Sequence, residues 1–176
     1  SAAAHRLLLA GQAANLGNLG GFSMPHSFVR LPNGHVLATF QYPAHGDHMV
    51  MDGRTGGLVE IDDPGAMVRG AGNADPAFAD EGLLPYGLAV LPEIDRVLVT
   101  NSPMGDDYLL TSNTYQIFRL SDLKLLGTHR LDPGARLNGH VSPEEPRVGP
   151  DGAVYIQTLS CGIQRVTGIG DGRPKA

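Results

Sequence analysis

The sequence predicts an all-β fold and, within that class, a β-propeller built from four-stranded blades. Glycine and proline account for 24 and 13 of the 176 residues, while only 18% of the residues are charged. This composition favours short strands and tight turns over long helices. A similar pattern of residues also occurs three times, at residues 25–40, 86–101 and 144–158. A repeat at a nearly fixed period is typical of propellers and other repeat architectures.

The first unit is predicted to form one blade of four strands. These strands lie at residues 27–31, 35–40, 57–62 and 66–69. The first two form a hairpin around Pro32-Asn33-Gly34, because an Asn-Gly pair adopts positive φ angles at low cost. The residues between the second and third strands, 41–54, read as a polar loop.

The second unit repeats this pattern, and the third unit is shorter. The second unit has predicted strands at residues 87–91, 96–101, 114–120 and 124–130. The third has predicted strands at residues 147–148, 153–159 and 162–166, around a Pro150-Asp151-Gly152 turn, and its fourth strand is missing or rudimentary.

The units make up one partial propeller domain. They cover approximately residues 25–72, 85–133 and 140–170, and residues 1–24 read as a strand and a loop from a preceding unit. Closed propellers have about four to eight blades, so three units do not close a ring. We therefore expect a larger ring, completed by a missing chain segment or by self-association. An open β-sandwich with a similar number of strands is the alternative architecture.

Composition also excludes several classes of function. The formal net charge of -5 and the lack of a Lys/Arg cluster argue against a nucleic-acid partner. No apolar run approaches the roughly 20 residues that a membrane-spanning helix needs. A single cysteine, Cys161, excludes an internal disulfide and a Cys-rich zinc site. The compartment stays open between periplasm and cytoplasm.

Candidate site residues emerge when the units are aligned on their prolines. His26, Tyr86 and Glu144 each stand six residues before the proline of their unit, and Glu145 follows directly. The first strand of each propeller blade lines the central channel, so these residues are expected to converge at one mouth of it. The alternative is that they are loop residues whose polar groups bond to nearby backbone.

Two histidines are candidate metal ligands. Imidazole is a common ligand for copper and zinc, so His26 is the strongest candidate. His140, on the loop that enters the third unit, is the second. The sequence has no G-x-S-x-G elbow, no P-loop and no dinucleotide-binding glycine motif. Hydrolase and nucleotide-binding functions therefore have no local support.

Several short segments carry a resemblance to a known family. Their sequences are Pro25-His26-Ser27, Leu31-Pro32-Asn33-Gly34, Gly56-Gly57-Leu58-Val59-Glu60-Ile61-Asp62 and Ile163-Gln164-Arg165. They resemble Pro-His-Thr, Leu-Pro-Asp-Gly, Gly-Gly-Phe-Val-Leu-Leu-Asp and Ile-Gln-Arg of the selenium-binding protein family, whose bacterial members include methanethiol oxidases. The resemblance extends over roughly residues 24–166.

This resemblance implies a seven-bladed propeller with a copper site of histidines near the channel. In the oxidases of that family, methanethiol is converted to formaldehyde, hydrogen sulfide and hydrogen peroxide. Only His26 matches a copper-ligand position, and Val29 stands where the family often has a second histidine. The predicted function is therefore copper-dependent oxidation of a small thiol. The alternative is a non-catalytic propeller that binds a protein or a small ligand.

Overall fold

The computed structural model of the chain describes residues 20–45, 48–49, 54–63, 65–103, 112–132, 142–159 and 162–176. Regular structure in these residues consists of β-strands and short 3-10 helices, among them η2 (Pro76–Phe78) and η3 (Pro92–Ile94). The predicted all-β class is confirmed. No helix in this described part has the length and apolar character that crossing a bilayer requires.

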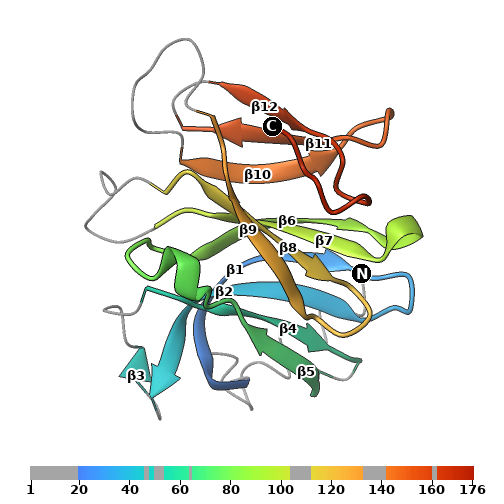
Figure 1. Cartoon of the computed structure of the whole chain (residues 1–176). Helices are drawn as coiled ribbons and strands as arrows, with labels where there is room; N and C mark the ends of the chain where they lie inside the picture. Colours follow the sequence, from blue (N-terminus) through green and yellow to red (C-terminus); the bar gives the residue numbers. More distant parts are fainter. Residues whose placement is uncertain are drawn as a thin grey trace.

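The strands form three antiparallel sheets (Figure 1). The first sheet has the order β1-β2-β4-β5, and β3 pairs with the end of β2. Its strands are β1 (Phe22–Arg30), β2 (Val36–His45), β3 (His48–Met49), β4 (Gly57–Ile61) and β5 (Met67–Gly72). Consecutive strands are neighbours, as in a propeller blade.

The second sheet has four strands and the third has three among the described residues. The second sheet consists of β6 (Pro85–Leu91), β7 (Arg96–Asn101), β8 (Thr114–Arg119) and β9 (Leu125–Arg130), in that order. The third consists of β10 (Pro143–Val148), β11 (Val154–Thr158) and β12 (Ile163–Val166). The hairpins predicted from the sequence are present in all three sheets.

Some predicted boundaries were wrong. The polar loop predicted at residues 41–54 is partly strand, because β2 continues to His45 and pairs with β3. Buried side chains at Gln41 and Tyr42 explain this extension, since they anchor the end of β2 in the interior. The first strand of the third sheet is also longer than the predicted residues 147–148. Its prolines are tolerated because β10 is an edge strand.

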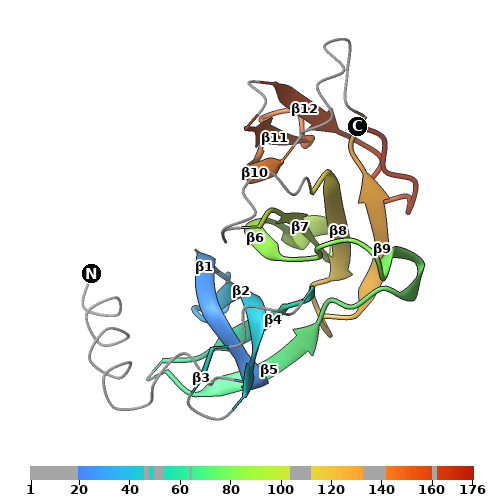
Figure 2. The same ribbon diagram turned by 90° about the vertical axis from the view of Figure 1, so that its left-hand side faces the viewer.

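The first strands of the three sheets lie next to one another, with β6 between β1 and β10 (Figure 2). Apolar residues of facing sheets fill the space between them. Between the first and second sheets lie Leu31, Leu37, Leu58, Leu88, Val97, Val99, Phe118 and Leu123. Between the second and third sheets lie Ala89, Leu91, Leu98, Tyr115, Ile117, Leu131, Val154, Ile156, Val166 and Ile169. Burial of these side chains stabilises the packing of one sheet against the next.

Candidate ligand site on the first strands

An irregularity interrupts the first strand of every sheet at the same place. The pairing register shifts over residues 25–28, 85–88 and 143–146, in each case directly after a proline. Such β-bulges change the direction of side chains and are frequent next to functional sites. The residues that directly follow the three prolines are His26, Tyr86 and Glu144. The three positions aligned on the sequence are therefore structurally equivalent.

A buried threonine ties the first bulge to the second sheet. The Thr39 hydroxyl accepts a hydrogen bond from the Ser27 backbone N–H at 3.0 Å. The same hydroxyl donates to the Tyr86 carbonyl at 2.7 Å. One side chain thus satisfies a backbone group of the bulge and one of the neighbouring sheet. Sequence reasoning missed Thr39, because threonine in a strand carries no signal of such a role.

The second bulge is tied to the third sheet in the same way. The Thr100 hydroxyl accepts from the Gly87 N–H at 3.0 Å and donates to the Glu144 carbonyl at 2.5 Å. In the third sheet, Gln157 holds the equivalent place opposite the bulge, and its Nε2 donates to Glu144 Oε2 at 3.2 Å. The spacing between the three equivalent positions is thus fixed by hydrogen bonds from threonine side chains to the backbone and does not depend on the side chains of these positions alone.

Glycine is required at residue 87 by the close approach of β10. A Cβ at this position would lie 2.5 Å from Pro146 Cδ and 2.8 Å from the Glu144 carbonyl oxygen. Both distances are far below van der Waals contact, so any larger residue would push β6 and β10 apart. Gly87 is therefore needed for the close approach of β6 and β10, a role that no signal in the sequence indicated.

His26 and Tyr86 are brought into ring contact. Their ring centroids lie 3.6 Å apart at an interplanar angle of 33°. Burial lowers the pKa of the half-buried His26 imidazole, although Glu145, a hydrogen bond to the Tyr86 backbone and Glu144 act in the opposite direction. The net direction favours the neutral ring at neutral pH. The carboxylates of Glu145 and Glu144 thus lie close enough to influence the His26 pKa, but burial has the larger effect.

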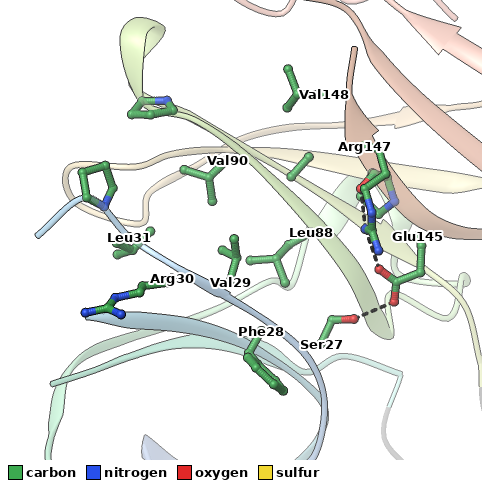
Figure 3. Close-up of a pocket in the computed structure, with 14 residues that line it drawn as sticks. Ser27, Phe28, Val29, Arg30, Leu31, Leu88, Val90, Glu145, Arg147 and Val148 are labelled. Atoms are coloured by element: carbon green, nitrogen blue, oxygen red, sulfur yellow. Dashed lines mark hydrogen bonds and ion pairs between the residues drawn. The ribbon is translucent and has the colours of Figure 1, made fainter. Parts of the chain in front are cut away.

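Ser27, which directly follows His26, forms a chain of hydrogen bonds with Glu145 and Arg147 (Figure 3). The Ser27 hydroxyl donates to Glu145 Oε1 at 2.7 Å, and Arg147 Nη1 donates to Glu145 Oε2 at 2.9 Å. Ser27 Oγ also lies 3.4 Å from His26 Nδ1. The predicted mouth residue Glu145 is thus connected to the first sheet. Ser27 and Arg147 were not predicted, because neither belongs to a sequence motif or to the positions aligned on the prolines.

Of the five predicted site residues, the structure brings together four, namely His26, Tyr86, Glu144 and Glu145. The fifth, His140, lies outside the described residues, as does Cys161.

A groove of about 570 Å³ extends from this cluster along β1, β6 and β10. Its volume lies within the range of about 300–1,000 Å³ that is typical of small-molecule sites. Ser27, Glu145 and Arg147 lie at one end of the groove, and Arg30 lies at the other (Figure 3). The apolar side chains along it include Phe28, Val29, Leu88, Val90 and Val148. The arrangement offers an apolar surface that ends in hydrogen-bonding and charged groups.

The residues gathered around His26 do not by themselves fit a copper centre. They supply one imidazole, His26, and two carboxylates, whereas copper prefers several nitrogen or sulfur ligands. Among the residues that the structure describes, no group of three or more His, Cys, Asp and Glu side chains is placed to hold a metal ion. The copper site therefore stays a prediction.

The fold is similar to solved structures at low sequence identity. A gluconolactonase from Xanthomonas campestris gives a TM-score of 0.51 and 16% identity, over 90% of this chain and 48% of that one. A protein of unknown function from Bacteroides caccae gives a TM-score of 0.51 and 11% identity, over 89% of this chain and 46% of that one. These neighbours include β-propeller proteins. This chain is part of a β-propeller.

At these identities the similarity establishes the propeller fold and nothing about activity. Virginiamycin B lyase from Staphylococcus aureus also matches, with a TM-score of 0.48 and 16% identity over 80% of this chain and 40% of that one. The chain thus spans about half of these structures or less. No family model matches the sequence, and no curated protein shows significant similarity to it. The resemblance to selenium-binding proteins stays a prediction.

Proposed function

We propose that this part of the propeller binds a small organic ligand in the groove along β1, β6 and β10. The observation that supports the proposal best is the position of the groove. It crosses the first strands of three consecutive sheets and ends at the Ser27–Glu145–Arg147 chain. Small-molecule sites are typically concave and mostly apolar, with a few fixed polar groups that orient the ligand. The groove has these properties.

Filling the groove tests this function. Val90 is half-buried and lines the groove, so a Val90→Trp substitution would place an indole in the space that a ligand needs. We expect the neutral apolar dye Nile red to bind the wild-type protein saturably. The variant should bind the dye at least about tenfold more weakly, because losing the buried apolar contact costs more than about 1.4 kcal/mol of binding free energy. Dye fluorescence during titration measures both affinities.

Leu126→Trp is the matched control, because Leu126 is exposed on β9 and does not line the groove. This variant should bind the dye as the wild type does. Lack of saturable binding to the wild type, or equal affinity of the Val90→Trp variant, would contradict the proposed binding function.

Copper-dependent thiol oxidation is the second candidate, and His26 is the residue that favours it. Its lowered pKa keeps the ring in the neutral form that binds metals. We expect the purified protein to contain copper in stoichiometric amount and the His26→Ala variant to lose it, as measured by elemental analysis. His35→Gln is the control, since His35 pairs with Glu60 away from the mouth. Unchanged copper in the His26→Ala variant would remove His26 from the site. A wild-type protein without copper and without thiol-dependent peroxide formation would exclude the oxidase.

A further inference from the structure

The side chains that line the groove carry more positive than negative charge. Arg30 and Arg147 line it together with a single carboxylate, Glu145. This local balance is opposite to that of the whole chain, whose formal net charge is -5. Arg30 makes no hydrogen bond or ion pair with the residues that the structure describes. Its charge therefore adds to the positive potential along the groove.

Arg147 is hydrogen-bonded to its neighbours although its side chain is 71% exposed. Its Nη1 donates to Glu145 Oε2 at 2.9 Å and to the Pro146 carbonyl at 2.9 Å. Glu145 is in turn fixed by the Ser27 hydroxyl at 2.7 Å. An exposed arginine otherwise keeps much of its rotamer freedom, and binding would have to remove it. The hydrogen bonds from Ser27 through Glu145 reduce this freedom before any ligand arrives.

Both hydrogen bonds of Arg147 come from one nitrogen. Within the described part of the chain, its Nε and Nη2 make no hydrogen bond. A guanidinium presents its donors in a planar fork that matches the two oxygens of a carboxylate. The apolar side chains of Leu88, Val90 and Val148 line the same groove. A ligand that satisfies both features has an anionic end and an aliphatic body.

We propose that the groove binds a small aliphatic monocarboxylate. Its carboxylate lies against the free donors of Arg147, its chain lies on the apolar wall, and the charge of Arg30 adds to the attraction. This inference rests on the proposed ligand-binding function and adds the chemical class of the ligand. Ser27 and Glu145 act as positioning residues for Arg147.

Three probes of equal chain length test the charge preference. Octanoate, octanol and octylammonium are titrated into the wild-type protein by isothermal calorimetry at low ionic strength. We expect octanoate to bind at least about tenfold more tightly than octanol, because a hydrogen bond to a charged partner exceeds a neutral one by about this factor. Octylammonium should bind most weakly. Equal or tighter binding of octylammonium would overturn the inference.

Arg147→Gln identifies the anchoring group. This variant should lose the preference for octanoate over octanol but keep the wild-type affinity for Nile red, which shows that the apolar part of the groove is intact. The matched control is Arg119→Gln. Arg119 pairs with Asp122 at 2.8 Å, much as Arg147 pairs with Glu145, but it does not line the groove. This variant should keep the preference.

The outcomes separate this inference from the proposed function. If no probe binds and Nile red does not bind either, the groove is not a ligand site and both fail. If octanol and octanoate bind equally well, the groove is a ligand site and the anionic class is wrong. A preference for octanoate that survives Arg147→Gln would show that Arg147 does not bind the carboxylate and would overturn the inference.

Discussion

Glu60 is a carboxylate whose surroundings decide its protonation. Its side chain is only 2% exposed, and burial alone would raise its pKa. Arg69 Nε donates to it at 2.6 Å, His35 Nδ1 lies 2.7 Å away, and Asn33 donates at 3.1 Å. These hydrogen bonds and the charge of Arg69 outweigh burial, so the pKa of Glu60 is lowered. Because Arg69 also donates to carbonyls at the turn between β8 and β9, Glu60 fixes a contact between two sheets.

Glu60→Gln should therefore destabilise the protein in a pH-dependent way. A group with a lowered pKa stabilises the fold above its unfolded pKa of about 4.3, and this stability is lost as the pH falls through the folded pKa. We expect the variant to lose about 1–3 kcal/mol near neutral pH, and the difference from wild type to shrink at lower pH. Urea unfolding of both proteins from neutral pH to a pH below about 4.3 measures this difference.

Asp122→Asn is the control for Glu60→Gln. Asp122 pairs with Arg119 in solvent, so its removal should change the free energy of unfolding little. The buried carboxylate would have no special role if Asp122→Asn lowered the free energy of unfolding as much as Glu60→Gln does. The same would follow if the loss of stability in Glu60→Gln did not depend on pH.

At the scale of elements, the bulges and the threonines opposite them determine how neighbouring sheets dock. Thr39 is fully buried and serves Ser27 and Tyr86 together. Thr39→Val keeps the shape but leaves the partly buried Ser27 N–H and Tyr86 carbonyl with one partner fewer, which should cost about 1–3 kcal/mol. The Ser27 amide should also exchange its hydrogen faster. Urea unfolding and hydrogen exchange measure the two effects.

Thr39→Ser keeps the hydroxyl and should recover most of the stability that Thr39→Val loses. If the serine and valine variants are equally stable, the hydroxyl does not hold the sheets together, and the destabilisation comes from altered packing instead.

The sequence predicted the hairpins because their signals are local. Turn residues such as Asn33-Gly34 and alternating apolar residues determine strand and turn over a few positions. The alignment on prolines also found the equivalence of His26, Tyr86 and Glu144. The Ser27–Glu145 bond could not be predicted, since it joins residues 118 positions apart in the chain. Strand β10 was predicted too short because its prolines count against a strand unless the strand is known to lie at an edge.

The whole molecule stacks its sheets one on the next, so each sheet depends on its neighbours for stability. The second sheet packs on both faces: Val97 and Phe118 belong to the core shared with the first sheet, and Leu98 and Ile117 to the core shared with the third. In the third sheet, Ile163 is 75% exposed. The third sheet is therefore stabilised mainly by the single core that it shares with the second sheet.

This arrangement predicts a gradient of local stability. Amides of β7 and β8 should exchange hydrogen most slowly and those of β12 fastest, because opening the third sheet exposes one core while opening the second exposes two. Native-state hydrogen exchange measures the gradient. Ile156→Ala, at a fully buried position of the core between the second and third sheets, should cost about 2–4 kcal/mol and speed exchange in β10 to β12 more than in β4. Equal acceleration in all sheets would show that the three sheets unfold as one cooperative unit, in which case the third sheet has no independent opening.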